Sequence, residues 1–148
     1  MPLPDPEEQA RRFAQVRFAH RTEVQEDYVE LIAELISAQG EARATDLATR
    51  LGVTPATVTA TLGRLKRDGL VEMLPYRSIF LTQKGRDLAA GSRARHLTVV
   101  RFLLALGVSP DTAENDAEGL EHHLSPETLA AMTAFADPPK PGPCRRPQ

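Results

Sequence analysis

Two predicted helices joined by one glycine-containing turn constrain the fold of this chain more than any other feature of its sequence. The first helix is predicted over residues 46–51 and ends at Gly52. Thr54 and Pro55 then supply the N-cap and the first-turn proline that start a second helix, which we expect to end before Gly69. Two helices connected in this way form a helix-turn-helix.

The second of these helices has two different faces. Its apolar side chains, Val58, Leu62 and Leu65, fall on one side and should pack inward. The other side is small, hydroxylated or basic, and it carries Ala56, Thr57, Ala60, Gly63, Arg64 and Arg67. Small groups allow close approach to base edges, while hydroxyls and arginines bind bases or phosphates. The alternative is an ordinary surface helix, because helix-turn-helix units also occur in proteins that never touch DNA.

A β-hairpin is predicted directly after the helix-turn-helix. Residues 70–74 and 79–81 are typical of strands, residues 75–78 form the turn with Arg77 at its tip, and Thr82 caps a new helix. This order of elements is that of a winged helix-turn-helix DNA-binding domain. We expect base contacts from Thr54, Ala56 and Ala60, and phosphate contacts from Thr57, Arg64 and Arg77.

Charge is unevenly distributed along the chain, although the net charge is only −2. Residues 43–101 carry a net charge of +7, whereas residues 1–42 carry −5, residues 102–137 carry −7 and the tail over 138–148 carries +3. The basic segment contains the helix-turn-helix and the wing, so it could meet a polyanion such as DNA, and the acidic segments could meet cations. Chance clustering of surface charge explains the same numbers equally well.

Further helices are predicted on the N-terminal side of this domain. The apolar spacing predicts a helix over 23–39 with Thr22 as its N-cap, after a weaker helical stretch over 7–20. Thr45 is the predicted N-cap of the short helix over 46–51.

The C-terminal half is also predicted to be helical. A long helix runs from Thr82 toward Gly107, where Gly91 could bend it, and two shorter helices start at the Ser-Pro pairs 109–110 and 125–126. A segment this small buries its apolar faces poorly alone, so we expect a homodimer formed through residues 102–136.

The predicted fold class is therefore mostly α, with a winged helix-turn-helix DNA-binding domain followed by an all-helical dimerisation domain. We expect four segments: a partly flexible N-terminal extension (1–22), the winged helix (23–90), the helical metal-binding and dimerisation domain (91–136) and a disordered proline-rich tail (137–148).

Several protein classes are excluded or disfavoured by the same sequence. No apolar run is long enough for a transmembrane helix, and the N-terminus has prolines and acids where a secretory signal has basic and apolar residues. We expect a cytoplasmic protein with no membrane partner. The single cysteine, Cys144, excludes an intrachain disulfide.

Carboxylates and imidazoles recur at helical spacing in the acidic segments. Glu118, Glu121 and His122 follow an i, i+3, i+4 pattern, which on a helix puts them on one face. Such a group can bind a metal ion, but a solvated acidic face near a helix start has the same pattern. Asp27 and Glu30 are three residues apart, and this pair too could bind a metal ion or simply belong to a solvated acidic face. His96 stands alone on the predicted long helix.

Several motifs together match a known family. They are EDYVE over 26–30, LKRDGLV over 65–71, LTQKG over 81–85, RARH over 93–96 and NDAEGLEHHL over 115–124. On these motifs the chain resembles the diphtheria-toxin-repressor family of metal-dependent transcriptional regulators, and within it the manganese-responsive branch. The resemblance covers roughly residues 23–136.

The resemblance implies a metal site and a function. The ligands would be Asp27, Glu30, His96, Glu118, Glu121 and His122. They would bind two Mn²⁺ ions per chain, with Fe²⁺, Co²⁺, Cd²⁺ or Zn²⁺ able to substitute. Iron-sensing relatives have sulfur ligands where this chain has Asp27 and Glu118, and hard oxygen ligands favour manganese. A homodimer loaded with Mn²⁺ would bind a pseudo-palindromic double-stranded operator and repress genes of manganese uptake or homeostasis, without enzymatic activity.

Two other functions compete with this interpretation. A winged-helix regulator that responds to a small molecule instead of a metal would bind DNA equally well in the presence of chelators. A carboxylate-bridged metalloenzyme would show redox or hydrolytic turnover and would need a substrate pocket. The basic face of the second helix disfavours the enzyme, which would not need it.

Overall fold

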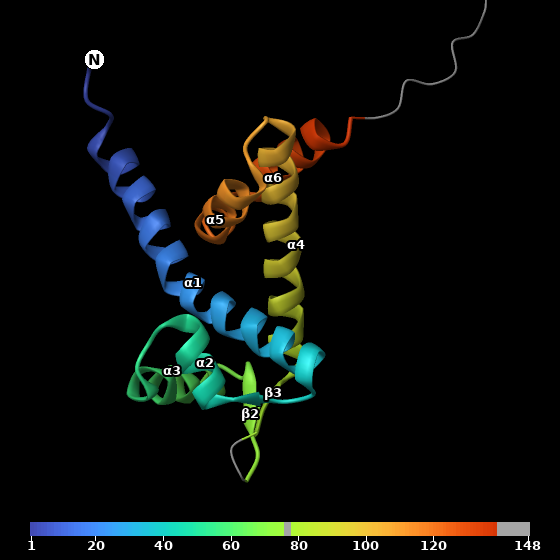
Figure 1. Cartoon of the computed structure of the whole chain (residues 1–148). Coiled ribbons are helices and arrows are strands. Elements are labelled where there is room, and N and C mark those ends of the chain that lie inside the picture. The colour runs from blue at the N-terminus through green and yellow to red at the C-terminus, as the bar shows by residue number, and fades with distance from the viewer. Residues whose placement is uncertain (76–77, 139–148) are drawn as a thin grey trace, which may run out of the picture. The chain divides into compact units, whose positions relative to one another are not determined.

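The computed structural model describes residues 1–75 and 78–138, so Cys144 and most of the proline-rich tail lie outside the described residues. The chain divides into two compact units, Met1–Ala94 and the residues from Arg95 onward, whose helices are labelled in Figure 1. Among the described residues, no helix is both long and apolar enough to cross a membrane.

The first unit is a winged helix. Its elements are α1 (Pro6–Gln39), β1 (Ala42–Arg43), α2 (Ala44–Leu51), α3 (Pro55–Arg67), β2 (Val71–Met73), β3 (Ser78–Leu81) and the first part of α4 (Gln83–Ala105). The strands form an antiparallel sheet in the order β1-β3-β2, in which Val71 pairs with Leu81 and Ala42 with Ile79. The predicted winged helix-turn-helix is therefore confirmed.

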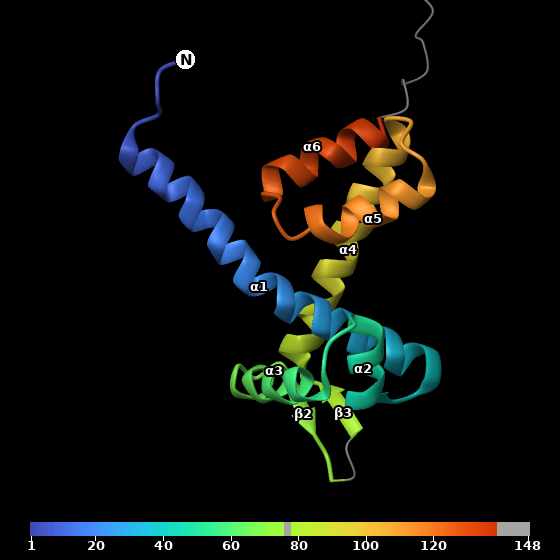
Figure 2. The same ribbon diagram turned by 60° about the vertical axis from the view of Figure 1, so that its left-hand side comes forward.

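The core of this unit joins the C-terminal half of α1 to the helix-turn-helix and the sheet. Its largest fully buried side chains are Val29 and Ile32 from α1, Leu47 from α2, Val58, Leu62 and Leu65 from α3, and Val71 and Ile79 from the sheet. Burial in α1 begins only at Tyr28. The N-terminal half of this helix extends beyond the other elements of the unit (Figure 2), and Phe13 and Phe18 on it are exposed.

Local capping explains where the helices of the winged helix begin and end. The Thr54 hydroxyl accepts a hydrogen bond from the Thr57 amide at 3.2 Å, as an N-cap does. Gly52 has a φ of 67°, a left-handed conformation that glycine adopts at low cost, and it ends α2. Thr82 caps α4, because its hydroxyl accepts from the Gly85 amide at 3.1 Å. These predicted helix boundaries are confirmed.

Two capping predictions were wrong. Thr22 does not start a helix: its hydroxyl donates to the Ala19 carbonyl at 3.0 Å inside α1, which runs unbroken through both predicted stretches because no glycine or proline separates them. The N-cap of α2 is Arg43, which makes no side-chain capping bond, rather than Thr45. The two-residue strand β1 was not predicted, since so short a segment carries no periodicity.

The second unit is helical. It contains α4 from Arg95 onward, α5 (Pro110–Leu120) and α6 (Pro126–Ala136), and α4 continues without interruption through Gly91. Val99, Val100, Ala113 and Ala117 form its small core, against which Leu103, Val108, Leu124, Leu129 and Met132 pack. Phe102 and Phe135 meet edge to face with their ring centroids 5.5 Å apart. Large apolar side chains remain exposed at Leu104, Leu106, Leu120 and Phe135.

Candidate metal centre

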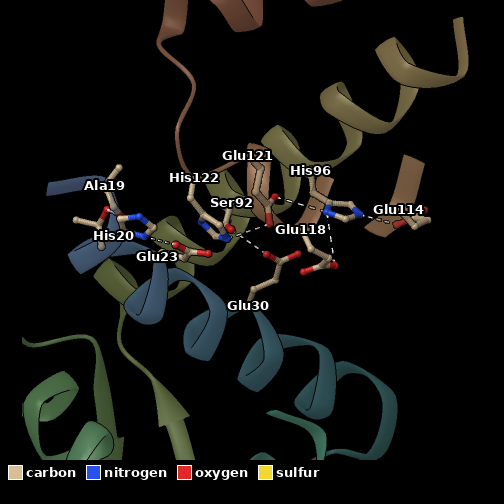
Figure 3. Close-up of polar contacts among 11 residues, drawn as sticks. Ala19, His20, Glu23, Glu30, Ser92, His96, Glu114, Glu118, Glu121 and His122 are labelled. Carbon is tan, nitrogen blue, oxygen red and sulfur yellow. Dashed lines mark hydrogen bonds and ion pairs between the residues drawn. The ribbon is translucent and has the colours of Figure 1, made fainter. Parts of the chain in front are cut away.

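His96 lies at the centre of the polar cluster in the second unit. Its imidazole is only 3% exposed, and Nε2 is 2.7 Å from Glu114 Oε2. Nδ1, on the other side of the ring, lies 3.7 Å from Glu118 Oε1 and 3.6 Å from Glu121 Oε2 (Figure 3). These last two distances are too long for hydrogen bonds, and Nδ1 has no hydrogen-bond partner among the described residues. A buried nitrogen thus faces two carboxylates without bonding to either.

The carboxylates of this cluster come from α5 and its C-terminal end. Glu114 and Glu118 stand one turn apart on α5, whereas the helix ends at Leu120 and Glu121 is its C-cap. His122 follows in the turn, with Nε2 3.4 Å from Glu121 Oε1. Glu121 keeps helical backbone angles and its amide bonds to the Ala117 carbonyl, so Glu118 and Glu121 share one face as predicted, whereas His122 lies in the turn beyond the helix and the predicted face does not extend to it. Glu121, only 1% exposed, lies close to both imidazoles.

These groups fit a divalent cation. One ligand atom from each of His96, Glu118 and Glu121 lies within 4.8 Å of the others, and a single ion could replace the missing hydrogen bonds between them. If Nε2 donates its proton to Glu114, the neutral ring keeps the Nδ1 lone pair for a metal. One imidazole nitrogen and several carboxylate oxygens form a donor set that suits manganese and similar ions.

Asp27 and Glu30, the other two predicted ligands with carboxylates, lie on α1 in the first unit. Both side chains are half-buried at the margin of the buried face formed by Tyr28 and Val29. Glu30 Oε2 accepts a hydrogen bond from the Ser92 hydroxyl at 2.8 Å. The cluster around His96 is formed within the second unit without these two residues.

The predicted DNA-reading face is accessible. Thr54, Ala56, Thr57, Ala60 and Arg64 are all exposed, while the apolar side of α3 is buried. Arg64 Nη2 donates to the Thr61 hydroxyl at 3.1 Å, which leaves the rest of its guanidinium exposed. Arg77, predicted at the wing tip, lies outside the described residues.

Both units of the chain match models of known protein families. Residues 20–79 match the family model described as iron dependent repressor, N-terminal DNA binding domain, and residues 82–148 match the iron dependent repressor, metal binding and dimerisation domain. The chain belongs to the DtxR/MntR family of metal-dependent transcriptional repressors. The family consists of transcriptional regulators and not of enzymes, so the metalloenzyme alternative is excluded.

Individual members of the DtxR/MntR family are similar over most of the chain. Transcriptional regulator MntR of Escherichia coli O157:H7 is 55% identical over 133 residues, which are 90% of this chain and 86% of the relative. HTH-type transcriptional regulator MntR of Lysinibacillus sphaericus (strain C3-41) is 41% identical over 100 residues, or 68% of this chain and 72% of the relative.

Solved structures of the DtxR/MntR family share the fold. A manganese-dependent transcriptional repressor in complex with manganese matches with a TM-score of 0.69 and 30% identity, over 76% of this chain and 52% of that one. The manganese regulator SloR matches with a TM-score of 0.69 and 27% identity, over 78% of this chain and 54% of that one. This chain spans about half the length of these solved structures.

Glu114 is a functional candidate that the sequence analysis missed. It lies on α5 one turn before Glu118 and two turns before Glu121, so the spacing i, i+4, i+7 could have indicated it. A carboxylate that accepts from the remote nitrogen of a metal-binding histidine fixes the orientation of the ring. Glu114 is therefore placed to orient His96 rather than to bind the ion itself.

Replacing Glu114 by alanine should weaken manganese binding by about 10- to 100-fold, because His96 would lose the bond that holds its ring. Isothermal titration of the metal-free variant with Mn²⁺ measures this. Glu127→Ala, at an exposed carboxylate on α6, is the control and should bind as the parent does. Equal affinities for the parent and Glu114→Ala would show that His96 needs no orienting carboxylate.

Metal binding should also depend on pH through His96. Burial lowers the pKa of this imidazole, but the hydrogen bond to Glu114 and the negative charges of Glu121, Glu118 and Glu114 outweigh burial and raise the pKa above its ordinary value of 6.5. In the metal-free fold, the protonated ring contributes stability that is fully present below pH 6.5 and is lost as the pH rises through the raised pKa.

A metal ion needs the deprotonated ring, so the metal and the proton compete. We expect manganese affinity to fall as the pH falls through the raised pKa, by about tenfold per pH unit for one displaced proton. Titrations in two buffers with different ionisation enthalpies would measure the proton released. An affinity that does not change with pH, with no proton released, would contradict His96 as a ligand.

Proposed function

We propose that this chain is a manganese-activated repressor that binds operator DNA as a homodimer and controls genes of manganese uptake or homeostasis. The observation that carries the proposal is the buried His96 imidazole facing Glu118 and Glu121 with no hydrogen bond to either. The names of the relatives, which are MntR regulators, and the manganese complex among the similar structures support manganese as the ion.

In this proposal six residues hold two ions per chain. They are Asp27, Glu30, His96, Glu118, Glu121 and His122. Bound Mn²⁺ would supply positive charge that offsets the mutual repulsion of four carboxylates. Fe²⁺, Co²⁺, Cd²⁺ or Zn²⁺ could occupy the same ligands, since the intrinsic affinity of several of them exceeds that of Mn²⁺ and the supply of metal then decides which one binds.

The proposed ligands belong to both units of the chain, and this provides a mechanism for regulation. Asp27 and Glu30 are part of the winged helix, which we assign to residues 23–90, and the other four are part of the dimerisation domain over 91–136. Ligands from both domains would couple the winged helix to the dimer. Metal activates DNA binding only if the DNA-binding arrangement has the higher metal affinity. A tenfold gain in DNA affinity needs only about 1.4 kcal/mol of coupling.

The DNA would be read by α3. Thr54, Ala56 and Ala60 are proposed to contact bases, and Thr57, Arg64 and Arg77 to contact phosphates. A homodimer presents two such helices related by twofold symmetry, so the operator would be pseudo-palindromic, with half-sites about one helical turn of DNA apart or a multiple of it. The exposed apolar side chains of α4, α5 and α6 support burial against a second copy.

The decisive experiment is a metal-controlled DNA-binding assay. An operator is first selected from random duplexes with the Mn²⁺-loaded protein, and its affinity is then measured at increasing Mn²⁺ and after removal of metal by a chelator. Elemental analysis gives the metal content per chain. We expect two ions per chain and DNA binding at least about tenfold tighter with metal. Equal DNA binding in the chelator would instead favour a regulator that responds to a small molecule.

A further inference from the structure

A polar pocket lies beside the DNA-reading helix in the first unit. It has a volume of about 300 Å³ and is formed between α1 and the C-terminal half of α3. Arg21 and Gln25 line it from α1, Thr61 and Arg64 line it from α3, and Asp68 lines it from the C-cap of α3. The family model for the DNA-binding domain begins at residue 20, so Arg21 lies at its N-terminal edge, in the stretch that was predicted to be a partly flexible extension.

The charges around this pocket leave two arginines available for an anion. Asp68, its only carboxylate among the described residues, accepts a hydrogen bond from Gln25 Nε2 at 2.7 Å. Arg21 forms no ion pair within the described part of the chain, and its guanidinium lies over the ring of Phe18, 5.9 Å from the ring centroid. Stacking of this kind positions the cation without neutralising it. Within the described part of the chain, the Arg64 side chain hydrogen-bonds only to the neutral Thr61 hydroxyl.

The pocket adjoins the exposed face of α3 that is proposed to read DNA. Arg64 follows Ala60 by one turn and Thr57 by two, so the three share that face. Arg21 stands on the α1 side of the same pocket, and Arg17 precedes Arg21 by one turn on α1. Arg64 on α3 and Arg21 on α1 therefore bring two positive charges to this pocket, and Arg17 adds a third positive charge one turn earlier on α1. No ion pair with a carboxylate neutralises them among residues 1–75 and 78–138.

We propose that Arg21, assisted by Arg17, binds backbone phosphates of the operator next to the segment read by α3. The N-terminal half of α1 then enlarges the DNA footprint of each winged helix beyond the helix-turn-helix and the wing. Guanidinium groups suit this role because they bind phosphate oxygens in a bidentate manner and stay charged. This inference rests on the proposed DNA-binding function and adds a contact that neither the wing nor α3 provides.

The test uses the full-length Mn²⁺-loaded protein with Arg21→Ala, Arg21→Lys and the parent. Affinity is measured for the selected operator and for an unrelated duplex over a series of salt concentrations. Removing one phosphate contact should lower the slope of log affinity against log salt by about 0.9, and it should weaken binding roughly five- to tenfold at about 0.1 M salt. The loss should be similar on both duplexes, because phosphates carry no sequence information. Arg21→Lys should retain most of the slope.

Arg11→Ala is the matched control. It removes the same charge from the same helix, but ten residues and therefore about 15 Å from Arg21 along the axis, away from the pocket. An unchanged slope in Arg21→Ala, or an equal loss in Arg11→Ala, would overturn the inference while the metal-dependent binding of the parent stands. A parent that binds neither duplex would overturn the proposed function and this inference together.

Discussion

Replacing Glu121 by glutamine is expected to abolish the manganese response of DNA binding. The side chain is almost fully buried, with Oε2 3.6 Å from His96 Nδ1 and Oε1 3.4 Å from His122 Nε2. Glutamine has nearly the same size but carries no charge, so the packing is retained while a ligand is lost. Because even residues that only orient ligands contribute 10- to 100-fold, we expect manganese affinity to fall by about 100-fold or more.

The measurement is Mn²⁺ titration of the metal-free variant, followed by the operator-binding assay at the Mn²⁺ concentration that just saturates the parent. Asp116→Asn provides the control, because it makes the same change of charge on α5, the helix that Glu121 caps, at an exposed position outside the cluster. We expect Asp116→Asn to respond to metal as the parent does. If Glu121→Gln also responds like the parent, the cluster around His96 is not the regulatory metal site.

Replacing Gly85 by alanine is expected to destabilise the winged helix strongly. A Cβ at this position would lie 2.1 Å from the Leu70 carbonyl oxygen and 3.1 Å from its carbon. That carbonyl cannot move away easily, because it accepts hydrogen bonds from the Thr82 amide at 3.0 Å and from the Thr82 hydroxyl at 3.2 Å. The start of α4 would therefore have to move away from Leu70, the residue directly before β2. We expect this movement to lower the free energy of unfolding by about 2–3 kcal/mol.

For a domain of this size, such a loss lowers the thermal midpoint by roughly 10 °C or more. Thermal unfolding of the metal-free protein, followed by circular dichroism, measures the change. Gly63→Ala is the matched control, because Gly63 also lies in a helix but a Cβ added there would meet nothing within 4 Å. It should raise stability by about 0.5–1 kcal/mol. A Gly85→Ala variant as stable as the parent would show that the contact relaxes freely.

Most elements of the fold follow from local rules that act over a few residues. The Thr54 cap, Pro55 and the left-handed Gly52 define the helix-turn-helix within one stretch of chain, and Thr82 starts α4 in the same way. The apolar period of α3 correctly predicted Val58, Leu62 and Leu65 as its buried face. Such signals are readable because both partners of each interaction lie close together in the sequence.

Where the predictions were wrong, an equally plausible local signal had competed with the correct one. Thr22 has the composition of a cap, yet its hydroxyl bonds back to Ala19 in a helix that nothing interrupts. Helical spacing placed His122 on the face of Glu118, but the helix ends at Leu120. The strand β1 exists only because Ala42 pairs with Ile79, a residue far away in the sequence.

The amino-acid sequence by itself determined the winged helix, the helical second half and, through its motifs, the family and the six candidate ligands. Only the tertiary structure decided which donors meet: packing of α4 against α5 brings His96 to Glu114, Glu118 and Glu121. It also decided that Arg21 and Arg64 line one pocket. The physical reason is that caps and periodicity act within a few residues, whereas a binding site depends on distances between side chains that only packing sets.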